Sequence, residues 1–403
     1  MIERPEYLNK LLEFRDKQLI KIITGVRRCG KSTLFELYQA KLAKLGVTKK
    51  QIQSINFEDP AYLELLDWKK LYSHITGKLV QNRKNYIFLD EIQNVPDFQK
   101  AADGLFIRKN VDLYLTGSNS KMLSGTWATL LSGRYVEIHL FPLSFKEYAA
   151  YCSPRPGTPR GDFETFDRLY GRYTGYSGFP YAVQLEDSLI REYLSGIYST
   201  IVLKDVAENK NLRDISRLES VIRFMADTIG SETSVHNIAK TMTSDGRKID
   251  THAVETYLDA LLDSYILYRA GRYDVKGKKH LKTLTKYYLV DVGLRYFLLG
   301  GRKRDLGHIL ENVVYLELRR RYRQVFIGKV DDKEVDFVAE GDNGVDYYQV
   351  SDTVRDRNTL DRELAPLEAI RDHNPKFLLT RDYEPPSSHN GIRQLNVLDW
   401  LLG

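Results

Sequence analysis

Two short segments of the chain combine residue types and spacings that suit phosphate chemistry. The first reads Gly25-Val26-Arg27-Arg28-Cys29-Gly30-Lys31-Ser32 and follows the apolar run 19–24. Two glycines, a lysine and a hydroxyl at this spacing are typical of a phosphate-binding loop (P-loop) between a strand and a helix. In such a loop, backbone N–H groups and the helix N-terminus surround the phosphates. We expect Lys31 to reach the β- and γ-phosphates of ATP and the Ser32 hydroxyl to ligate Mg²⁺. The residues predicted to contact the nucleotide are Gly25, Val26, Arg27, Arg28, Cys29, Gly30, Lys31, Ser32 and Thr33.

The second segment is an apolar run, 86–89, that ends on Asp90 and Glu91. An ATPase needs two carboxylates at such a strand end. Asp90 is predicted to hold Mg²⁺ through water, and Glu91 to polarise the attacking water. The alternative is a surface Asp-Glu pair, which the abrupt change from four apolar residues to two carboxylates disfavours.

Three further residues are candidates for roles in ATP hydrolysis. The run 113–117 leads into Ser118 and Asn119, either of which could contact the γ-phosphate or orient the water. Arg134 precedes another apolar run and could project into a neighbouring subunit's site as an arginine finger. A surface salt bridge is the competing interpretation of Arg134.

The elements that must position these residues alternate between strands and helices over the first 140 residues. Alternation of this kind predicts an α/β fold with a parallel sheet covered on both faces. The predicted strands are 19–24, 51–57, 86–89, 112–116 and 135–140, with a helix at 32–45. Beyond residue 143 the pattern becomes mostly helical, with a turn-rich stretch at 153–161.

These motifs together resemble AAA+ ATPases, and in particular an uncharacterised prokaryotic group that carries further C-terminal domains. The resembling segments are 25–32, 89–93, 115–118, 132–135 and 141–145, extended by 179–180 and 288–294. The resemblance implies an ATPase core at 1–143 and a helical lid at 144–205. It also implies a sensor strand between the strands that lead to Lys31 and Asp90. Asn56 matches a position where such proteins carry a polar partner for the catalytic glutamate, although it could equally cap a turn.

The segment 206–300 is predicted to form a winged helix. Helices are expected at 234–242 and 249–262, followed by a strand hairpin rich in basic residues. Such a hairpin could follow a phosphate backbone, which makes DNA a candidate partner. A merely solvated hairpin, or a protein contact, is the alternative. The basic residues are Arg269, Arg272, Lys276, Lys278, Lys279, Lys282 and Lys286.

The segment 301–403 is similar to the PD-(D/E)xK nuclease superfamily in its order of elements: helix, three strands, helix, strand. Glu311 and Asp336 match two of the acidic positions that such chemistry requires. Gln349 and Ser351 replace the remaining carboxylate and the lysine, so we expect this domain to lack nuclease activity. Glu311 and Asp336 could instead pair with the arginines at 319–321.

Composition adds limits to these predictions. The net charge of +6 is too small by itself to indicate a nucleic-acid partner. No apolar run approaches the about 18 residues of a membrane span, and no signal pattern opens the sequence, so no membrane partner is expected. Cys29 and Cys152 suit neither a disulfide nor a metal site, which favours the cytoplasm. The sequence therefore predicts an ATP- and Mg²⁺-dependent AAA+ switch or motor that forms a homo-oligomer and acts on DNA. An ATP-gated nuclease and a signalling ATPase that binds protein are the alternatives.

Overall fold

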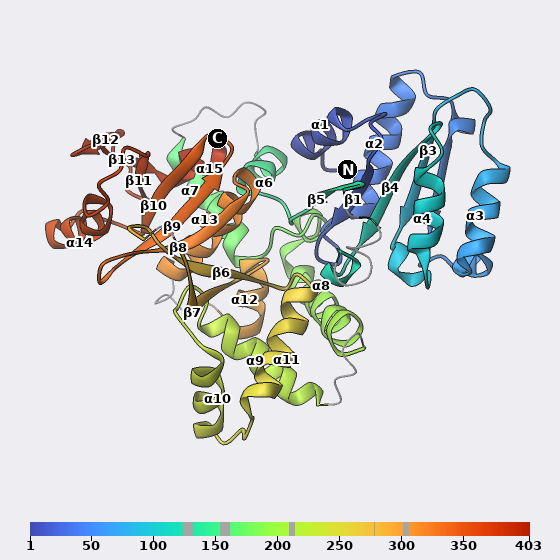
Figure 1. The fold of residues 1–403 in the computed structure, drawn as a ribbon. Helices are drawn as coiled ribbons and strands as arrows, with labels where there is room; N and C mark the ends of the chain where they lie inside the picture. The colour runs from blue at the N-terminus through green and yellow to red at the C-terminus, as the bar shows by residue number, and fades with distance from the viewer. Residues whose placement is uncertain (124–130, 132, 154–161, 209–213, 278, 301–305) are drawn as a thin grey trace. The chain divides into compact units, whose positions relative to one another are not determined.

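The computed structural model describes residues 1–403 except 124–130, 132, 154–161, 209–213, 278 and 301–305 (Figure 1). The chain forms two compact units. The first comprises Met1–Pro142 with Asp263–Tyr265, and the second Leu143–Leu262 with Ile266–Gly403. The boundaries predicted near residues 205 and 300 both fall inside the second unit, and the division into four domains stays a prediction.

A five-stranded sheet forms the centre of the first unit, in the order β2-β3-β4-β1-β5. All four neighbouring pairs are parallel, which confirms the predicted α/β class. Strand β4 lies between β1 and β3, as the resemblance implied. The strands are β1 (Ile20–Thr24), β2 (Ile52–Asn56), β3 (Asn85–Asp90), β4 (Val111–Gly117) and β5 (Tyr135–His139), and the helices are α1 (Pro5–Glu13), α2 (Lys31–Lys44), α3 (Trp68–Gly77) and α4 (Phe98–Phe106).

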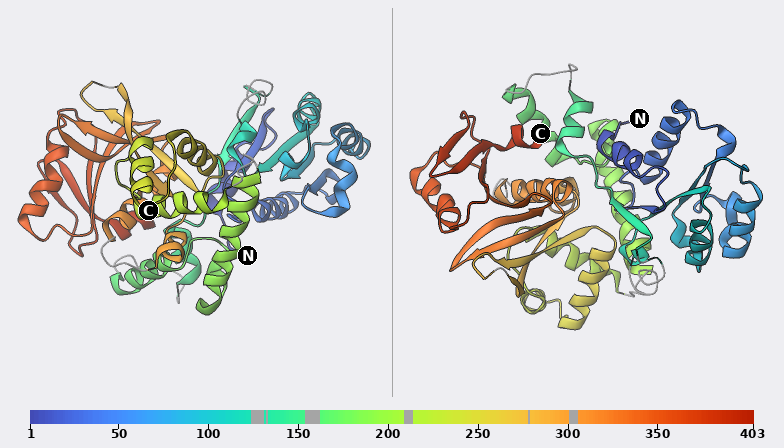
Figure 2. Two further views of the ribbon diagram at one scale, coloured as in Figure 1. Left: turned by 90° about the horizontal axis from the view of Figure 1, so that it is seen from below. Right: turned by 45° about the horizontal axis from the view of Figure 1, so that its top comes forward.

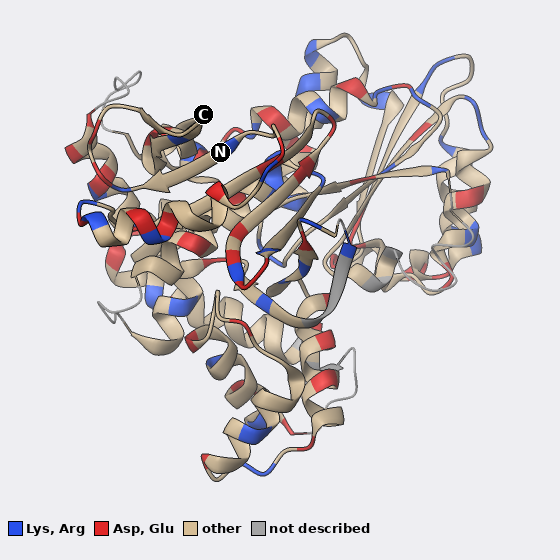
Figure 3. Ribbon diagram, turned by 60° about the vertical axis from the view of Figure 1, so that its left-hand side comes forward, with Lys and Arg blue, Asp and Glu red and all other residues tan. Residues whose placement is uncertain are grey.

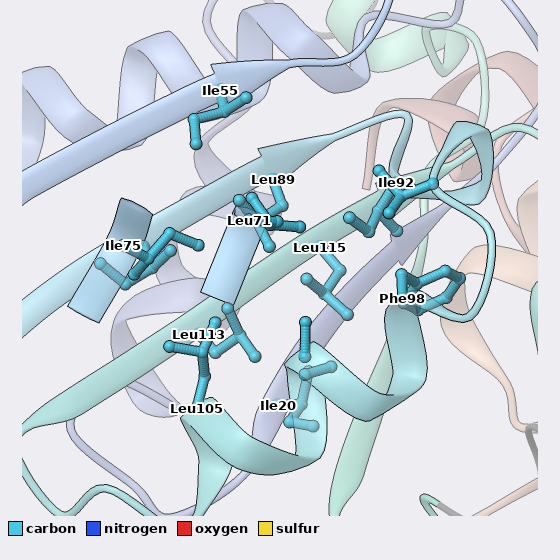
Figure 4. Close-up of a cluster of buried hydrophobic side chains, with 14 of the residues drawn as sticks. Ile20, Ile55, Leu71, Ile75, Leu89, Ile92, Phe98, Leu105, Leu113 and Leu115 are labelled. Atoms are coloured by element: carbon cyan, nitrogen blue, oxygen red, sulfur yellow. The ribbon is translucent and has the colours of Figure 1, made fainter. Parts of the chain in front are cut away.

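Helices cover both faces of this sheet, because successive side chains of a strand point to opposite faces. On one face, α2 packs its aromatic residues against those of the sheet: Phe35 lies 5.0 Å from Phe88, and Tyr38 lies 5.3 Å from Tyr114, between ring centroids. On the other face, α3 and α4 enclose an apolar cluster that includes Leu89 and Leu115 (Figure 4). The residues next to Phe88 and Tyr114 along each strand therefore form the second core layer.

The second unit contains an eight-stranded mixed sheet in the order β12-β13-β11-β10-β9-β8-β6-β7. Helix α13 lies along this sheet, and α14 packs against β9 and β10 (Figure 2). The strands are β6 (Leu267–Asp274), β7 (Lys279–Leu289), β8 (Gln324–Val330), β9 (Lys333–Gly341), β10 (Gly344–Ser351), β11 (Lys376–Thr380), β12 (Ser387–His389) and β13 (Ile392–Asn396). The helices are α6 (Phe145–Cys152), α7 (Phe163–Gly175), α8 (Asp187–Thr200), α9 (Ile215–Asp227), α10 (Val235–Ser244), α11 (Thr251–Asp263), α12 (Val292–Leu299), α13 (Leu306–Arg321), α14 (Arg357–Glu368) and α15 (Val397–Leu402).

The two helices and the hairpin of the predicted winged helix appear as α10, α11 and β6-β7. The hairpin does not stand apart, however. Strand β6 pairs in parallel with β8 from Arg272 to Asp274, so the hairpin forms one edge of the C-terminal sheet. Strand β7 lies at the opposite end of this sheet from β12, and its Thr285 forms an antiparallel bridge with Thr233. The predicted order of helix, three strands, helix and strand in the C-terminal segment is present as α13, β8, β9, β10, α14 and β11.

Asp291 connects two segments that lie far apart in the sequence, 177–180 and 288–294. Its carboxylate accepts hydrogen bonds from the backbone N–H of Gly178 at 2.7 Å and of Leu294 at 3.0 Å. A Cβ on Gly293 would lie only 2.3 Å from the Tyr176 carbonyl oxygen, so glycine is required for this close approach. These motifs join α12 to the segment that follows α7.

Basic and acidic residues are interspersed along the ribbon in both units (Figure 3). Within the described residues, no helix combines the length and apolar character needed to cross a membrane.

Candidate nucleotide-binding site

The P-loop lies between the end of β1 and the start of α2, as predicted. Gly25 has a φ of +145°, and a Cβ there would lie 2.2 Å from the Leu140 carbonyl oxygen. Only glycine fits this turn without strain. The loop ends at Gly30, and α2 begins at Lys31. The backbone N–H groups of the first turn of α2 have no partner within the helix, which favours an anion at this end.

Lys31 is buried and turns back onto its own loop. Its ammonium donates to the carbonyl oxygens of Gly25 at 3.1 Å and Val26 at 3.4 Å. It also forms an ion pair with Glu91 at 3.4 Å. Burial alone lowers the pKa of Lys31, but the neighbouring Glu91 carboxylate raises it above its ordinary value. The lysine is therefore a fixed positive charge inside the loop.

Asp90 and Glu91 end β3 beside this lysine, and both are buried. The Asp90 carboxylate accepts hydrogen bonds from the hydroxyls of Ser32 and Thr116. Burial raises its pKa, and these two hydroxyls oppose the rise. The structure thus brings together the two residues predicted to hold Mg²⁺.

A hydroxyl, one carboxylate and phosphate oxygens form an oxygen donor set that fits Mg²⁺, which usually keeps several waters as well. Among the described residues, no group of three or more His, Cys, Asp or Glu side chains could hold a metal ion by itself. The Ser32 hydroxyl and the Asp90 carboxylate would hold a Mg²⁺ ion at this site together with phosphate oxygens.

Glu91 is held at several points. Its backbone φ is +51°, an uncommon value for a residue with a side chain. Its N–H donates to the Thr116 hydroxyl at 2.8 Å, and its carboxylate accepts from Gln93 Nε2 at 2.5 Å. Burial raises the pKa of Glu91, but the Lys31 ammonium and the hydrogen bonds from Gln93 and Ser118 bring it below its ordinary value. Glu91 is therefore an ionised carboxylate in a fixed position.

The end of β4 supplies the predicted sensor position. Ser118 is buried, and its hydroxyl lies near both Glu91 and Gln93. Asn119 is buried next to it. The sequence analysis did not identify Thr116 and Gln93. The position of Thr116, two residues before Ser118 and so on the same face of β4, was the available signal. The Asn56 carboxamide oxygen accepts from the Glu58 N–H at 2.9 Å and so caps the turn after β2.

The remaining loop residues differ in their surroundings. Arg27 pairs with Glu58 at 2.5 Å, and Arg28 is exposed with a φ of +68°. Thr33 is half-buried in the first turn of α2. Cys29 is buried, and burial raises the pKa of its thiol. Because the thiolate is the reactive form of cysteine, this raised pKa makes Cys29 less reactive.

Arg134 forms an ion pair with Asp103 of α4, and its guanidinium lies over the Phe106 ring. Both charged side chains are about 40% exposed, at 43% and 39%. Among the described contacts, none joins Arg134 to the P-loop or to the end of β3. The surface salt bridge considered above is therefore present, and the finger role stays a prediction.

The C-terminal sheet contains a second polar cluster. Glu311 and Asp336, predicted as neighbours, interact electrostatically, and their alternative pairing with the arginines at 319–321 stays a prediction. Arg320 and Arg321 pair with Glu317. The cation beside Glu311 is Lys286 of β7, which lies 3.0 Å from Glu311 and 2.7 Å from Glu334.

Lys286 was counted among the basic residues of the hairpin, but it is 5% exposed and faces the carboxylates. Its alternation with the buried Tyr288 was the signal for a lysine on a core-facing side of the strand. Gln349 donates to Glu363 at 2.9 Å, so this side chain binds another residue of the same unit. Ser351 donates to the Thr353 carbonyl at 3.1 Å.

This chain is similar to known protein families and to solved structures. Residues 17–149 match a family described as an AAA domain, and residues 167–305 match a domain of unknown function. The Walker-type ATPase PABY2304 of Pyrococcus abyssi is 16% identical, with 74% of this chain and 96% of that chain covered at a TM-score of 0.48. The Aeropyrum pernix Orc1 protein in complex with DNA is 15% identical, with 74% and 92% covered at a TM-score of 0.32.

Two relatives match along most of their own length. An uncharacterized protein of Haemophilus influenzae is 39% identical over 100% of this chain and 99% of its own. The uncharacterized protein MJ1544 of Methanocaldococcus jannaschii is 31% identical over 88% of this chain and 79% of its own. The chain therefore belongs to one family with these two proteins, and residues 17–149 match the AAA domain model.

Proposed function

We propose that the protein binds ATP with Mg²⁺ at the P-loop and hydrolyses it to ADP and phosphate. The observation that carries this proposal is the grouping of the buried Lys31, Asp90 and Glu91 with the Ser32 hydroxyl, drawn from the ends of two parallel strands and the loops that follow them. A fixed ammonium and a helix N-terminus suit phosphates, and an ionised carboxylate suits the activation of water.

The residues divide the work between binding and chemistry. Lys31 neutralises the β- and γ-phosphates and exchanges its loop carbonyl partners for phosphate oxygens. Ser32 and Asp90 hold Mg²⁺, which supplies charge stabilisation to the transferring phosphoryl group. Glu91 accepts the proton of the attacking water, and Ser118 or Asn119 orients the γ-phosphate or that water.

The decisive experiment compares nucleotide binding with turnover in two variants. Lys31→Ala is expected to lose ATP binding, because it removes the buried ammonium that would neutralise the phosphates. Glu91→Gln is expected to bind ATP and to lose about 10²-fold or more of its turnover, the usual contribution of a general base. Glu36→Gln, an exposed carboxylate on α2, is the matched control and should leave both properties unchanged. Tight ATP binding by Lys31→Ala would overturn the assignment of the site.

We also propose DNA as the partner whose engagement depends on the ATP state. Support comes from the exposed basic residues Arg269, Lys276 and Lys279 on the β6-β7 hairpin. Fewer basic residues are available to contact DNA than the sequence indicated, because Lys286 is buried and Arg272 pairs with Glu232 at 3.1 Å. Lys276 pairs with Asp331 at 2.6 Å, an exposed pair that phosphate can displace at low cost. Lys278 lies outside the described residues.

The test of the DNA partner measures ATP turnover and salt-dependent binding with single- and double-stranded DNA. Lys276→Ala with Lys279→Ala should weaken DNA binding and reduce its salt dependence, because fewer counterions are released. Lys49→Ala with Lys50→Ala removes the same charge from an exposed site of the first unit and serves as the control. Absence of salt-dependent DNA binding would favour a protein partner, the alternative function.

Nuclease activity is not part of the proposed function. The Lys286 ammonium contacts the carboxylates of Glu311 and Glu334 in the C-terminal cluster, and Gln349 and Ser351 supply neither a carboxylate nor a lysine. We expect no metal-dependent cleavage of plasmid DNA by the full chain. Cleavage that Asp336→Asn abolishes would favour the ATP-gated nuclease instead.

A further inference from the structure

Gln93 lies two residues after Glu91 and joins the two strand ends of the site. Its Nε2 donates to the Glu91 carboxylate at 2.5 Å and to the Ser118 hydroxyl at 3.4 Å. The orientation of the amide follows from its chemistry, because the exchange of its nitrogen and oxygen would place two acceptors in contact. One amide group therefore connects the end of β3 to the end of β4.

The oxygen of the same amide has no partner. Gln93 Oε1 is buried without a hydrogen bond among the described residues, which is an unfavourable state for a polar atom. The left-handed backbone of Glu91, two residues earlier, is a second unfavourable feature at the same point. Costs that concentrate at one site are typical of a geometry maintained for function, because stability alone would not retain them.

We propose that Gln93 is the positioning residue of Glu91, and that it couples the water-activating carboxylate to the sensor end of β4. This inference rests on the proposed ATPase function, in which Gln93 was given no role. Gln93 does not touch the reacting atoms. Its amide holds one carboxylate oxygen of Glu91. The Lys31 ammonium lies 3.4 Å from the other oxygen and sets its direction.

The coupling has a direct consequence for the chemical step. In that step a water oxygen bonds to the γ-phosphorus, the bond from this phosphorus to the bridging oxygen of ADP breaks, and Glu91 takes the proton of the water. When phosphate draws the Lys31 ammonium away, Glu91 loses its ionic partner within the loop. The amide of Gln93 then remains to hold the carboxylate, together with the Ser118 hydroxyl. A displacement of about 1 Å at this point costs up to about 10²-fold in rate.

The test is Gln93→Met, which keeps the length of the side chain and removes both the donor and the unpaired oxygen. We expect kcat to fall about 10- to 100-fold with KM for ATP within about twofold of wild type. We also expect the acid limb of the kcat profile to move to higher pH, because the Glu91 carboxylate loses the amide donor that favours its charged form. Stability should be unchanged or higher, because an unsatisfied buried oxygen is removed.

Gln99→Met is a closely matched control. Gln99 also has a buried Oε1 without a partner, and its Nε2 also donates to a carboxylate, that of Asp97 at 3.4 Å. It lies on α4 and contacts neither Glu91 nor Ser118 in any described hydrogen bond. Gln99→Met should keep the kcat and the pH profile of wild type. Gln93→Glu provides a second measure, because a like charge beside Glu91 should move the acid limb further still.

The outcomes separate this inference from the function on which it rests. Without Mg²⁺-dependent turnover by wild type that Glu91→Gln abolishes, the proposed function itself fails. If wild type hydrolyses ATP while Gln93→Met keeps both its kcat and its pH profile, the positioning role alone is wrong. A fall in kcat that accompanies a lower melting temperature with an unshifted profile would assign Gln93 a structural role only.

Discussion

At the scale of single residues, Asp291 predicts how stability depends on pH. Burial raises the pKa of this carboxyl to about 6, while the N–H groups of Gly178 and Leu294 oppose the rise. Because the folded pKa lies above the unfolded value, the folded state binds the proton more tightly. The contribution of Asp291 to stability is thus fully present below about pH 4 and is lost as the pH rises through about 6. The loss amounts to about 3 kcal/mol.

Asp291→Asn should abolish this loss, since a carboxamide does not titrate. Urea unfolding should be measured at pH 4 and pH 7. Between these two pH values, the free energy of unfolding of the variant should rise by about 3 kcal/mol relative to that of wild type. Asp356→Asn is the control, because Asp356 caps α14 through the Thr359 N–H from an exposed position. A difference that is equal at both pH values would mean that Asp291 does not titrate in this range.

At the scale of elements, a buried ion pair links β1 to β4. Lys21 and Asp112 are both fully buried, and the Tyr114 hydroxyl donates to the same carboxylate at 2.9 Å. Lys21→Met should lower the free energy of unfolding by about 3–5 kcal/mol, because it leaves Asp112 buried without its ionic partner. Lys21→Met with Asp112→Leu should recover much of that loss. Lys100→Met breaks the exposed Lys100–Asp97 pair and should cost less than about 1 kcal/mol.

A second prediction at this scale concerns Lys286, which connects β7 to α13 and β9. Its ammonium is the cation that offsets the carboxylates of Glu311, Glu334 and Asp336. Lys286→Met should lower the melting temperature of the full chain, since it leaves these carboxylates without that cation. An unchanged melting temperature would show that Lys286 does not neutralise this cluster.

At the scale of the whole molecule, Arg134 tests whether ATP turnover requires assembly. If Arg134 completes a neighbouring subunit's site, Arg134→Ala should lower turnover about 10³-fold or more where the protein assembles. Asp103→Asn removes the partner that Arg134 has within its own chain. It should leave turnover intact, because the arginine itself remains available. Equal effects of the two variants would assign Arg134 to the salt bridge alone, and turnover should then be independent of protein concentration.

The sequence alone indicated which residues form the candidate nucleotide site. Lys31 and Ser32 were predictable from the glycine-containing loop after an apolar strand, and Asp90 and Glu91 from the end of another apolar strand, because strand ends of a parallel sheet meet at one edge. The helices and strands named from the sequence agree with the structure to within a few residues, because their periodicity is local.

Tertiary structure alone decided which groups support that chemistry. Thr116 reaches Glu91, and Gln93 reaches Ser118, only because β3 and β4 are neighbours; each of these contacts spans 25 residues of sequence. Lys286 faces Glu311 because β6-β7 joins the C-terminal sheet, whereas its sequence context suggested a basic surface. Arg134 meets Asp103 through the packing of α4. Local patterns specify the type of each element and the face on which a side chain lies. The residue that a side chain contacts depends on which distant elements pack together. The local periodicity of the sequence does not contain this information.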